Sequence, residues 1–160
     1  MKKAALLVLS VGLLTPLRAS SDAPAQADHL MVLPNQVEWK DAPPALPPGA
    51  KAAVLEGDPT KPGPFTLRIQ MPKGYKIQPH THPGVEHVTV LAGKFQMGLG
   101  DKWDDKALHD IPVAGFAVMQ VGTKHFAGCK QACTVQVHGI GPWGITYVNP
   151  ADDPRNQAKK

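Results

Sequence analysis

The chain has 160 residues and a formal net charge of +4 at pH 7, with 17 basic and 13 acidic side chains. This length gives room for one domain with a hydrophobic core and would be cramped for two. The basic residues form no cluster or stripe of the kind that binds nucleic acid, and the sequence shows no internal repeat or heptad pattern. A nucleic-acid-binding protein, a solenoid and a coiled coil are therefore excluded.

Residues 1–27 have the features of a secretory signal peptide. Lys2 and Lys3 precede an apolar run over residues 4–14, and the small residues at 25–27 form the best cleavage site, with 23–25 as a weaker one. The apolar run falls short of the ~20 residues that a membrane anchor needs. We therefore expect export to the periplasm or the medium, and no stable membrane span after processing.

Residues 28–64 form an N-terminal arm rich in Pro and Gly, with short extended pieces near 37–39 and 52–55 and no helix of useful length. From residue 65 to residue 150 we expect a barrel or sandwich of short strands, followed by a polar tail over 151–160. Runs that alternate or are wholly apolar predict strands at residues 65–71, 85–92, 95–99, 116–121, 134–140 and 145–148. Many short strands without helical periodicity predict an all-β domain.

Residues 74–93, GYKIQPHTHPGVEHVTVLAG, carry an unusual density of metal-ligand side chains within this strand-like pattern. His80 and His82 are two residues apart, so on a strand both side chains point to one face, about 7 Å apart. Glu86 has the same parity but would lie a further ~13 Å along a straight strand. Ligands must meet within ~2.0–2.2 Å of one ion, so the chain must bend at Pro83-Gly84.

The alternative interpretation is that these are ordinary surface histidines beside prolines, because an H-x-H pair arises easily in a chain with seven His. The glutamate argues against it. The chain has only three Glu, and Glu86 stands at the start of a strand that looks buried. A buried carboxylate needs a partner or a cation, so the pattern favours a metal site.

The two cysteines, Cys129 and Cys133, predict a disulfide, because an even number of cysteines in an exported chain favours pairing. The segment between them fits the tip of a hairpin, and so short a loop would fix a turn more than it would stabilise the fold. A redox-active pair is the alternative, although C-x-x-x-C lacks the two-residue spacing of thioredoxin-like motifs.

The same stretch resembles the first cupin motif, G-x5-H-x-H-x3,4-E-x6-G. Gly74, His80, His82, Glu86 and Gly93 stand at those positions without a gap. The region from about residue 28 to residue 154, with the ending GPWGITYVNPADDP, is similar to small exported bacterial single-domain cupins. The resemblance implies a cupin double-stranded β-helix, a small antiparallel β-barrel or jelly roll.

A degenerate form of the second cupin motif, G-x5-P-x-G-x2-H-x3-N, follows. Gly122 and His125 match its G-x2-H, while Gln120 replaces the usual Pro, Cys129 replaces the usual Asn, and Gly115 is displaced by one position. Because the essential histidine is present, the resemblance implies that His125 completes the ligand set.

The ligand set that the resemblance implies is His80, His82, Glu86 and His125, around one divalent transition metal inside the barrel. Three imidazoles and a carboxylate suit Fe, Mn, Ni, Cu, Co or Zn, and they leave two adjacent positions open on an octahedral ion. Open positions are typical of catalytic rather than structural sites.

Other side chains compete for a role. His29 and His109 fall in expected loop or edge segments and are expected to be solvated. His138 points outward if the Cys129–Cys133 hairpin is symmetric and pairs His125 with Val137. A one-residue shift would instead turn Gln136 and His138 inward, so His138, like Glu86, is a candidate for acid–base catalysis.

Trp143 lies among turn residues in the run GPWG, residues 141–144, and is interpreted either as a plug at the barrel end or as a core aromatic near a turn. The expected lining of the barrel is apolar, and Arg68 is the one arginine that could point inward. The expected lining residues are Phe95, Met97, Met119, Phe126 and Val137.

Two functions fit this pattern. One is a metal-dependent, dioxygenase-like oxidoreductase, or an isomerase or lyase, acting on a small organic molecule, and the other is a non-catalytic periplasmic protein that binds a metal or a small ligand. An apolar lining weakly favours the second. The expected partner is a small molecule rather than nucleic acid, and a homodimer is possible because cupins commonly form dimers.

Overall fold

The structure is a computed structural model, and it describes residues 29–157. The account below concerns the unit that begins at Val32. The predicted signal peptide lies outside the described residues. Among the residues that are described, no helix is long and apolar enough to cross a membrane.

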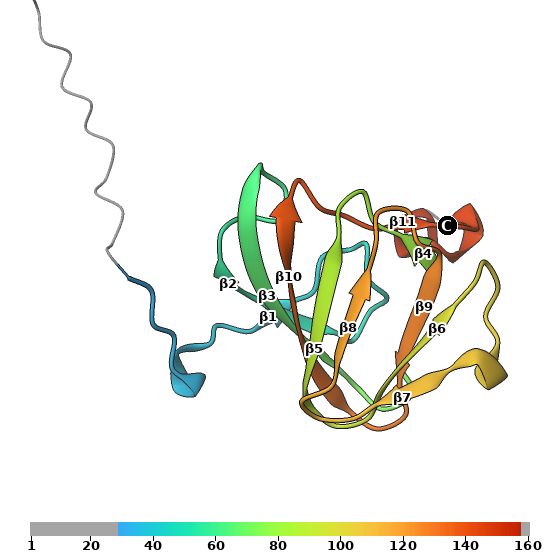
Figure 1. Ribbon diagram of the computed structural model, residues 1–160, viewed down its shortest axis with the longest axis horizontal. Helices are drawn as coiled ribbons and strands as arrows, with labels where there is room; N and C mark the ends of the chain where they lie inside the picture. Colours follow the sequence, from blue (N-terminus) through green and yellow to red (C-terminus); the bar gives the residue numbers. More distant parts are fainter. Residues whose placement is uncertain (1–28, 158–160) are drawn as a thin grey trace, which may run out of the picture. The chain divides into compact units, whose positions relative to one another are not determined.

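The unit that begins at Val32 is an all-β domain of two antiparallel sheets that enclose one core (Figure 1). One sheet has six strands in the order β1 (Lys40–Asp41), β2 (Lys51–Glu56), β3 (Gly63–Met71), β10 (Cys133–Gly141), β5 (Glu86–Ala92) and β8 (Phe116–Met119). The other has five, in the order β11 (Thr146–Tyr147), β4 (Lys76–Thr81), β9 (His125–Cys129), β6 (Phe95–Leu99) and β7 (His109–Ile111). The short helical segments are η1 (Pro34–Gln36), η2 (Asp105–Ala107), η3 (Pro150–Asp152) and α1 (Pro154–Gln157).

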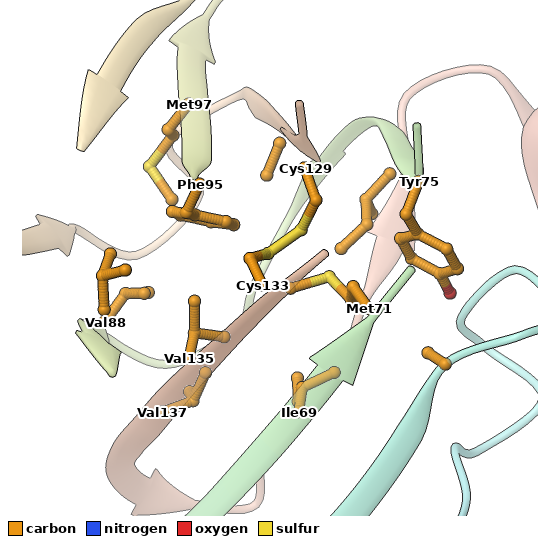
Figure 2. Close-up of a cluster of buried hydrophobic side chains, with 14 of the residues drawn as sticks. Ile69, Met71, Tyr75, Val88, Phe95, Met97, Cys129, Cys133, Val135 and Val137 are labelled. Atoms are coloured by element: carbon orange, nitrogen blue, oxygen red, sulfur yellow. A yellow bond between two sulfur atoms is a disulfide. The ribbon is translucent and has the colours of Figure 1, made fainter. Parts of the chain in front are cut away.

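Buried and more exposed side chains alternate along the strands, and the buried ones form the core between the sheets. In β3 every second residue is buried, while the residues between them are more exposed, as expected for a strand with one face on the core. Strands β5 and β10 repeat this pattern from the neighbouring positions of the same sheet. Figure 2 shows the resulting cluster, in which the side chains of both sheets meet around the disulfide.

All six predicted strands are present, with ends that shift by no more than two residues, and the all-β fold is confirmed. The short edge strand β7 and the strands β4 and β9 were not among the predicted runs. Strand β4 gave no apolar run because four of its six residues are polar and Pro79 interrupts it. Strand β9 was missed because every residue in it is buried, so its sequence does not alternate.

Cys129 and Cys133 are joined in a disulfide, but the expected hairpin between them is wrong. Cys129 ends β9 in the five-stranded sheet, and Cys133 begins β10 in the six-stranded sheet, so residues 130–132 carry the chain from one sheet to the other. Strand β9 pairs with β4 and β6, and β10 pairs with β3 and β5. The disulfide therefore joins the two sheets inside the core instead of fixing a two-stranded turn (Figure 2).

The N-terminal arm is held against the barrel by two buried tyrosines. The Tyr75 hydroxyl donates to the carbonyl of Pro47, and the Tyr147 hydroxyl donates to the carbonyl of Ala45 at 2.8 Å. Because Tyr147 belongs to β11, the arm and the last strand of the five-stranded sheet are fixed to each other close to the site described next.

Candidate metal centre

A β-bulge in β4 sets the direction of the first histidine. Ile77 pairs with Ala127 of β9, yet His80 pairs with His125, so β4 holds one residue more than β9 between these two positions. Residues three apart on a regular strand face opposite sides. The extra residue, in the Gln78–Pro79 region, restores the inward direction, and both Ile77 and His80 are buried.

The chain crosses between the two sheets immediately after His82. Strand β4 ends at Thr81, Pro83 and Gly84 form a bend, and Glu86 opens β5 in the opposite sheet. The bend stands where the ligand geometry required it. The carboxylate therefore reaches the centre from the six-stranded sheet, whereas the histidines reach it from the side of the five-stranded sheet.

The four side chains meet in the interior. His80, His82 and His125 each offer a ring nitrogen within 4.8 Å of the others, a cluster that is suited to a metal ion. Glu86 lies beside them, with Oε1 3.6 Å from His82 Nε2 and Oε2 3.3 Å from His125 Nε2. All four are between 1% and 6% exposed, so the centre is largely shielded from bulk water.

Backbone carbonyls fix the tautomer of each histidine. Nδ1 of His80 lies 2.7 Å from the carbonyl of Gln78, Nδ1 of His82 lies 2.6 Å from that of Gly144, and Nδ1 of His125 lies 2.9 Å from that of Thr123. A carbonyl oxygen can only accept, so each Nδ1 carries the proton and donates it. Each Nε2 then faces the centre, which is the arrangement in which imidazoles bind metals.

The imidazole Nε2 atoms and the Glu86 carboxylate are all hydrogen-bond acceptors. Among the described residues none of these groups donates a hydrogen bond to another. Burial lowers the pKa of His80 well below its usual value of 6.5, with the neighbouring His125 and His82 adding to the effect. Burial also lowers the pKa of His82, although Glu86 opposes this. A neutral ring with its proton on Nδ1 cannot donate to Glu86.

Two buried atoms at the centre indicate a bound cation. His82 Nε2 and Glu86 Oε2 are both buried, and neither has a hydrogen-bond partner within the part of the chain that the structure describes. Buried polar atoms without partners are costly. A cation at the centre would satisfy both atoms, so these residues fit a divalent metal.

His138 is not among the clustered side chains. It faces away from the core on β10, pairs with His87 of β5, and stacks on that ring at 4.8 Å with an angle of 10° between the planes. Gln136 shares this outer face, where it accepts a hydrogen bond of 3.1 Å from Arg68 Nε. Arg68, the one arginine that could have pointed inward, therefore faces outward, because Leu67 and Ile69 take the core side of β3.

Phe126 is also misplaced in the expected lining of the barrel. His125 points inward, so the next residue of β9 points outward, where Phe126 packs under Trp103 with ring centroids 5.0 Å apart. Gly98 makes room for it, since a Cβ there would lie 2.4 Å from the Phe126 ring. Phe95, Met97 and Val137 do belong to the core between the sheets, and Met119 packs against it.

Sequence reasoning missed the groups that orient the histidines. The carbonyls of Gln78 and Thr123 are backbone atoms, which no side-chain pattern reveals. Gly144 lies in the GPWG run, but its carbonyl could be assigned to His82 only once the fold was known. Trp143, beside it, stacks on the His82 ring at 4.3 Å.

The fold and the histidine cluster define the chain as a cupin. A family model described as the ChrR cupin-like domain matches residues 27–106, which is half of the chain and contains His80, His82 and Glu86. The protein therefore belongs to this cupin family. No match was found among curated proteins.

Solved structures support the fold. A polyketide cyclase from Streptomyces resistomycificus has a TM-score of 0.63 and 16% identity over 81% of this chain and 92% of its own. A proposed acetylacetone dioxygenase from Methylibium petroleiphilum has a TM-score of 0.61 and 22% identity, over 81% and 88% of the two chains. A salicylate 1,2-dioxygenase variant from Pseudoaminobacter salicylatoxidans has a TM-score of 0.52 and 12% identity, over 65% and 32%. At these identities the likeness shows the fold alone.

Proposed function

We propose that this cupin holds one divalent transition metal through His80, His82, Glu86 and His125, and that it acts as a dioxygenase-like oxidoreductase on a small organic molecule. The observation that carries the proposal is the set of buried acceptors that converge without a donor among the described residues, above all His82 Nε2 and Glu86 Oε2. The names of the dioxygenases among the structural neighbours support the reaction class by analogy of fold.

A bound ion would supply Lewis acidity and, if it is redox-active, electrons for oxygen chemistry. The protein's own residues have separate tasks. The three imidazoles are aimed at the centre by backbone carbonyls, and Glu86 supplies the negative charge that offsets the ion. Glu86 is the one acidic side chain among the buried residues that the structure describes, so it is also the group placed to accept a proton at the centre.

The second candidate is a non-catalytic protein that binds a metal or a small ligand. It is favoured by the burial of the centre, because ligands that are only 1–6% exposed can meet an organic substrate only if a segment moves. The two candidates share the same metal site and differ only in whether a substrate reaches it.

We also propose that the protein is exported to the periplasm or secreted, after cleavage near residue 27. Support comes from the basic and apolar start of the sequence and from the disulfide, since such bonds persist in oxidising compartments. The intact mass of protein from the periplasmic fraction tests this. A mass that still includes residues 1–27 would contradict it.

Elemental analysis of purified wild-type protein tests the metal site. We expect about one metal ion per chain, which His82→Ala and Glu86→Ala should each reduce strongly, because either change removes a ligand. His109→Ala is the matched control, since His109 is exposed on the edge strand β7 and should leave the metal content unchanged. Oxygen uptake by the loaded protein, with small aromatic or diketone compounds as trial substrates, then separates an enzyme from a binding protein. The metal proposal fails if wild type holds no metal and cannot be loaded with any.

A further inference from the structure

Residues 142–145, called the Trp143 strap below, connect β10 to β11 and lie against the metal centre. The carbonyl of Gly144 accepts the proton of His82 Nδ1 at 2.6 Å. The Trp143 ring stacks on the His82 ring with centroids 4.3 Å apart and planes 19° apart. One short segment therefore determines both the tilt and the tautomer of this ligand.

His82 differs from the other two histidines in this respect. His80 and His125 each donate to a carbonyl two residues earlier in the chain, so their orientation is set locally. His82 donates to a carbonyl 62 residues later. If the strap moves, the first two rings keep their partners and His82 loses its own.

The strap itself is held by few hydrogen bonds, while Trp143 and Ile145 also pack against the hydrophobic core. After Gly141, residues 142–145 belong to no strand. Their anchors are the Trp143 amide, which donates to the Pro59 carbonyl at 2.6 Å, and the exposed Arg155, which donates to the Ile145 carbonyl at 3.3 Å. Trp143 also packs against Phe65, with ring centroids 5.5 Å apart. A segment outside the ladder with few bonds can open at lower cost than the strands around it.

The indole of Trp143 supplies a second observation. Its Nε1 is buried and finds no hydrogen-bond partner among the described residues, although tryptophan N–H groups usually find one when they are buried. A hydrogen bond of the indole therefore does not hold Trp143 in this position. Its ring is held by packing, on His82 and on Phe65.

We propose that Trp143 is a positioning residue for His82, and that the Trp143 strap is the movable cover of the metal centre. The inference rests on the proposed metal site. By clamping the ring of His82, the strap keeps this ligand on the ion, and by covering the centre it sets how fast a metal ion or small ligand enters and leaves. The barrel strands, with His80, Glu86 and His125, stay in place while the strap opens.

The test is the rate at which a metal leaves the protein. Wild type and Trp143→Ala are loaded with Co(II), and release to an excess of chelator is followed by the visible absorption of the bound ion. Partners that orient metal ligands are typically worth about 10- to 100-fold in metal affinity, so we expect Trp143→Ala to release the ion faster by a factor in that range. Its absorption spectrum should also change, because His82 is no longer held at one angle.

Two further variants separate positioning from general damage. Trp143→Phe keeps an aromatic ring against His82 and should restore most of the slow release. Trp103→Phe is the matched control, because Trp103 packs on Phe126 at the outer face of the barrel and should leave both rate and spectrum as in wild type.

Gly141→Ala tests the strap without changing any residue that contacts His82. A Cβ at Gly141 would lie 2.2 Å from the Lys61 carbonyl oxygen and 3.0 Å from the Pro59 carbonyl oxygen, which is the anchor of the strap. The added methyl must therefore push the chain at Gly141 and the segment 59–61 apart, which disturbs this anchor. We expect faster release here as well, with circular dichroism showing that the barrel remains folded.

The outcomes distinguish the two proposals. If wild type binds Co(II) but Trp143→Ala and Gly141→Ala release it at the wild-type rate with an unchanged spectrum, the strap inference is wrong and the metal site stands. If wild type binds neither Co(II) nor any other divalent transition metal, the proposed function itself fails. If Trp143→Ala does not fold, Gly141→Ala still decides the matter, since unchanged release in this variant would overturn the inference.

Discussion

His80 and His125 are cross-strand partners of β4 and β9, and their ring centroids lie 4.2 Å apart on the inner face of the five-stranded sheet. Strand β4 holds one extra residue between Ile77 and His80. The bulge lets both side chains face inward although they are three residues apart.

Deletion of Gln78 should therefore remove the bulge and keep the metal site. Without Gln78, Ile77 and His80 stand two residues apart opposite Ala127 and His125, so regular alternation turns both side chains to the inner face. We expect the metal content to stay at about one ion per chain. Circular dichroism and a thiol assay for the disulfide would show whether the barrel is intact. Loss of the metal in a folded deletion variant would contradict this account of the bulge.

Glu86→Gln should change stability in opposite directions with and without metal. In the metal-free protein the substitution removes a buried charge that has no cation, and the new amide can donate to His82 Nε2 or His125 Nε2. The metal-free variant should gain roughly 1–3 kcal/mol, the usual cost of an unsatisfied buried group.

The same variant should bind metal more weakly, so that loading raises its melting temperature less than that of wild type. For wild type, an ion at 100 times its dissociation constant adds about 2.7 kcal/mol. Differential scanning calorimetry with chelator and then with metal measures both effects. A lower melting temperature for metal-free Glu86→Gln would show that Glu86 is satisfied without a cation.

The metal-free protein should lose stability as the pH falls below 6.5. Burial lowers the pKa values of His80 and His82 in the folded state, whereas in the unfolded chain these groups titrate near 6.5. Below that pH the unfolded state binds more protons, so the free energy of unfolding decreases until the folded pKa values are reached.

Urea unfolding in excess chelator between pH 8 and pH 5 measures this slope. His80→Asn should flatten the profile, because it removes one of the two depressed groups, while His109→Asn should leave it unchanged. A wild-type stability that is constant or rises toward pH 5 would be inconsistent with neutral buried imidazoles.

Removal of the disulfide should weaken the fold and leave the metal site intact. Cys129 and Cys133 are four residues apart, so loop closure accounts for roughly 2 kcal/mol in the chain-entropy model. The double variant Cys129→Ala/Cys133→Ala also loses sulfur packing between the sheets. We expect a lower urea midpoint with normal metal content. Loss of the metal in a folded double variant would mean that the bridge also shapes the centre.

Local patterns predicted six of the strands and the bend that brings His80, His82 and Glu86 together, because alternation and turn signals are properties of neighbouring residues. The arrangement in space was harder to predict. The short Cys129–Cys133 segment is compatible with a hairpin, and only the pairing of β9 with β6 and of β10 with β3 shows that it crosses between sheets.

Arg68 and Phe126 differ in how far their strands reveal the inner face. In β3 the alternation puts Leu67 and Ile69 on the core side and Arg68 on the other face, so the sequence itself favours an outward Arg68. In β9 every residue is buried, so the pattern does not say which face Phe126 takes. The link from His82 to Gly144 was beyond prediction, since it joins a side chain to a distant backbone carbonyl.

The most direct test of the metal centre is a crystal structure of the loaded protein, measured at the absorption edge of the bound metal. The proposed site predicts one strong anomalous peak per chain, ligated by Nε2 of His80, His82 and His125 and by the Glu86 carboxylate, at about 2.0–2.2 Å for an ion such as zinc. A peak elsewhere, ligation through Nδ1, or no peak in protein soaked with metal would contradict it.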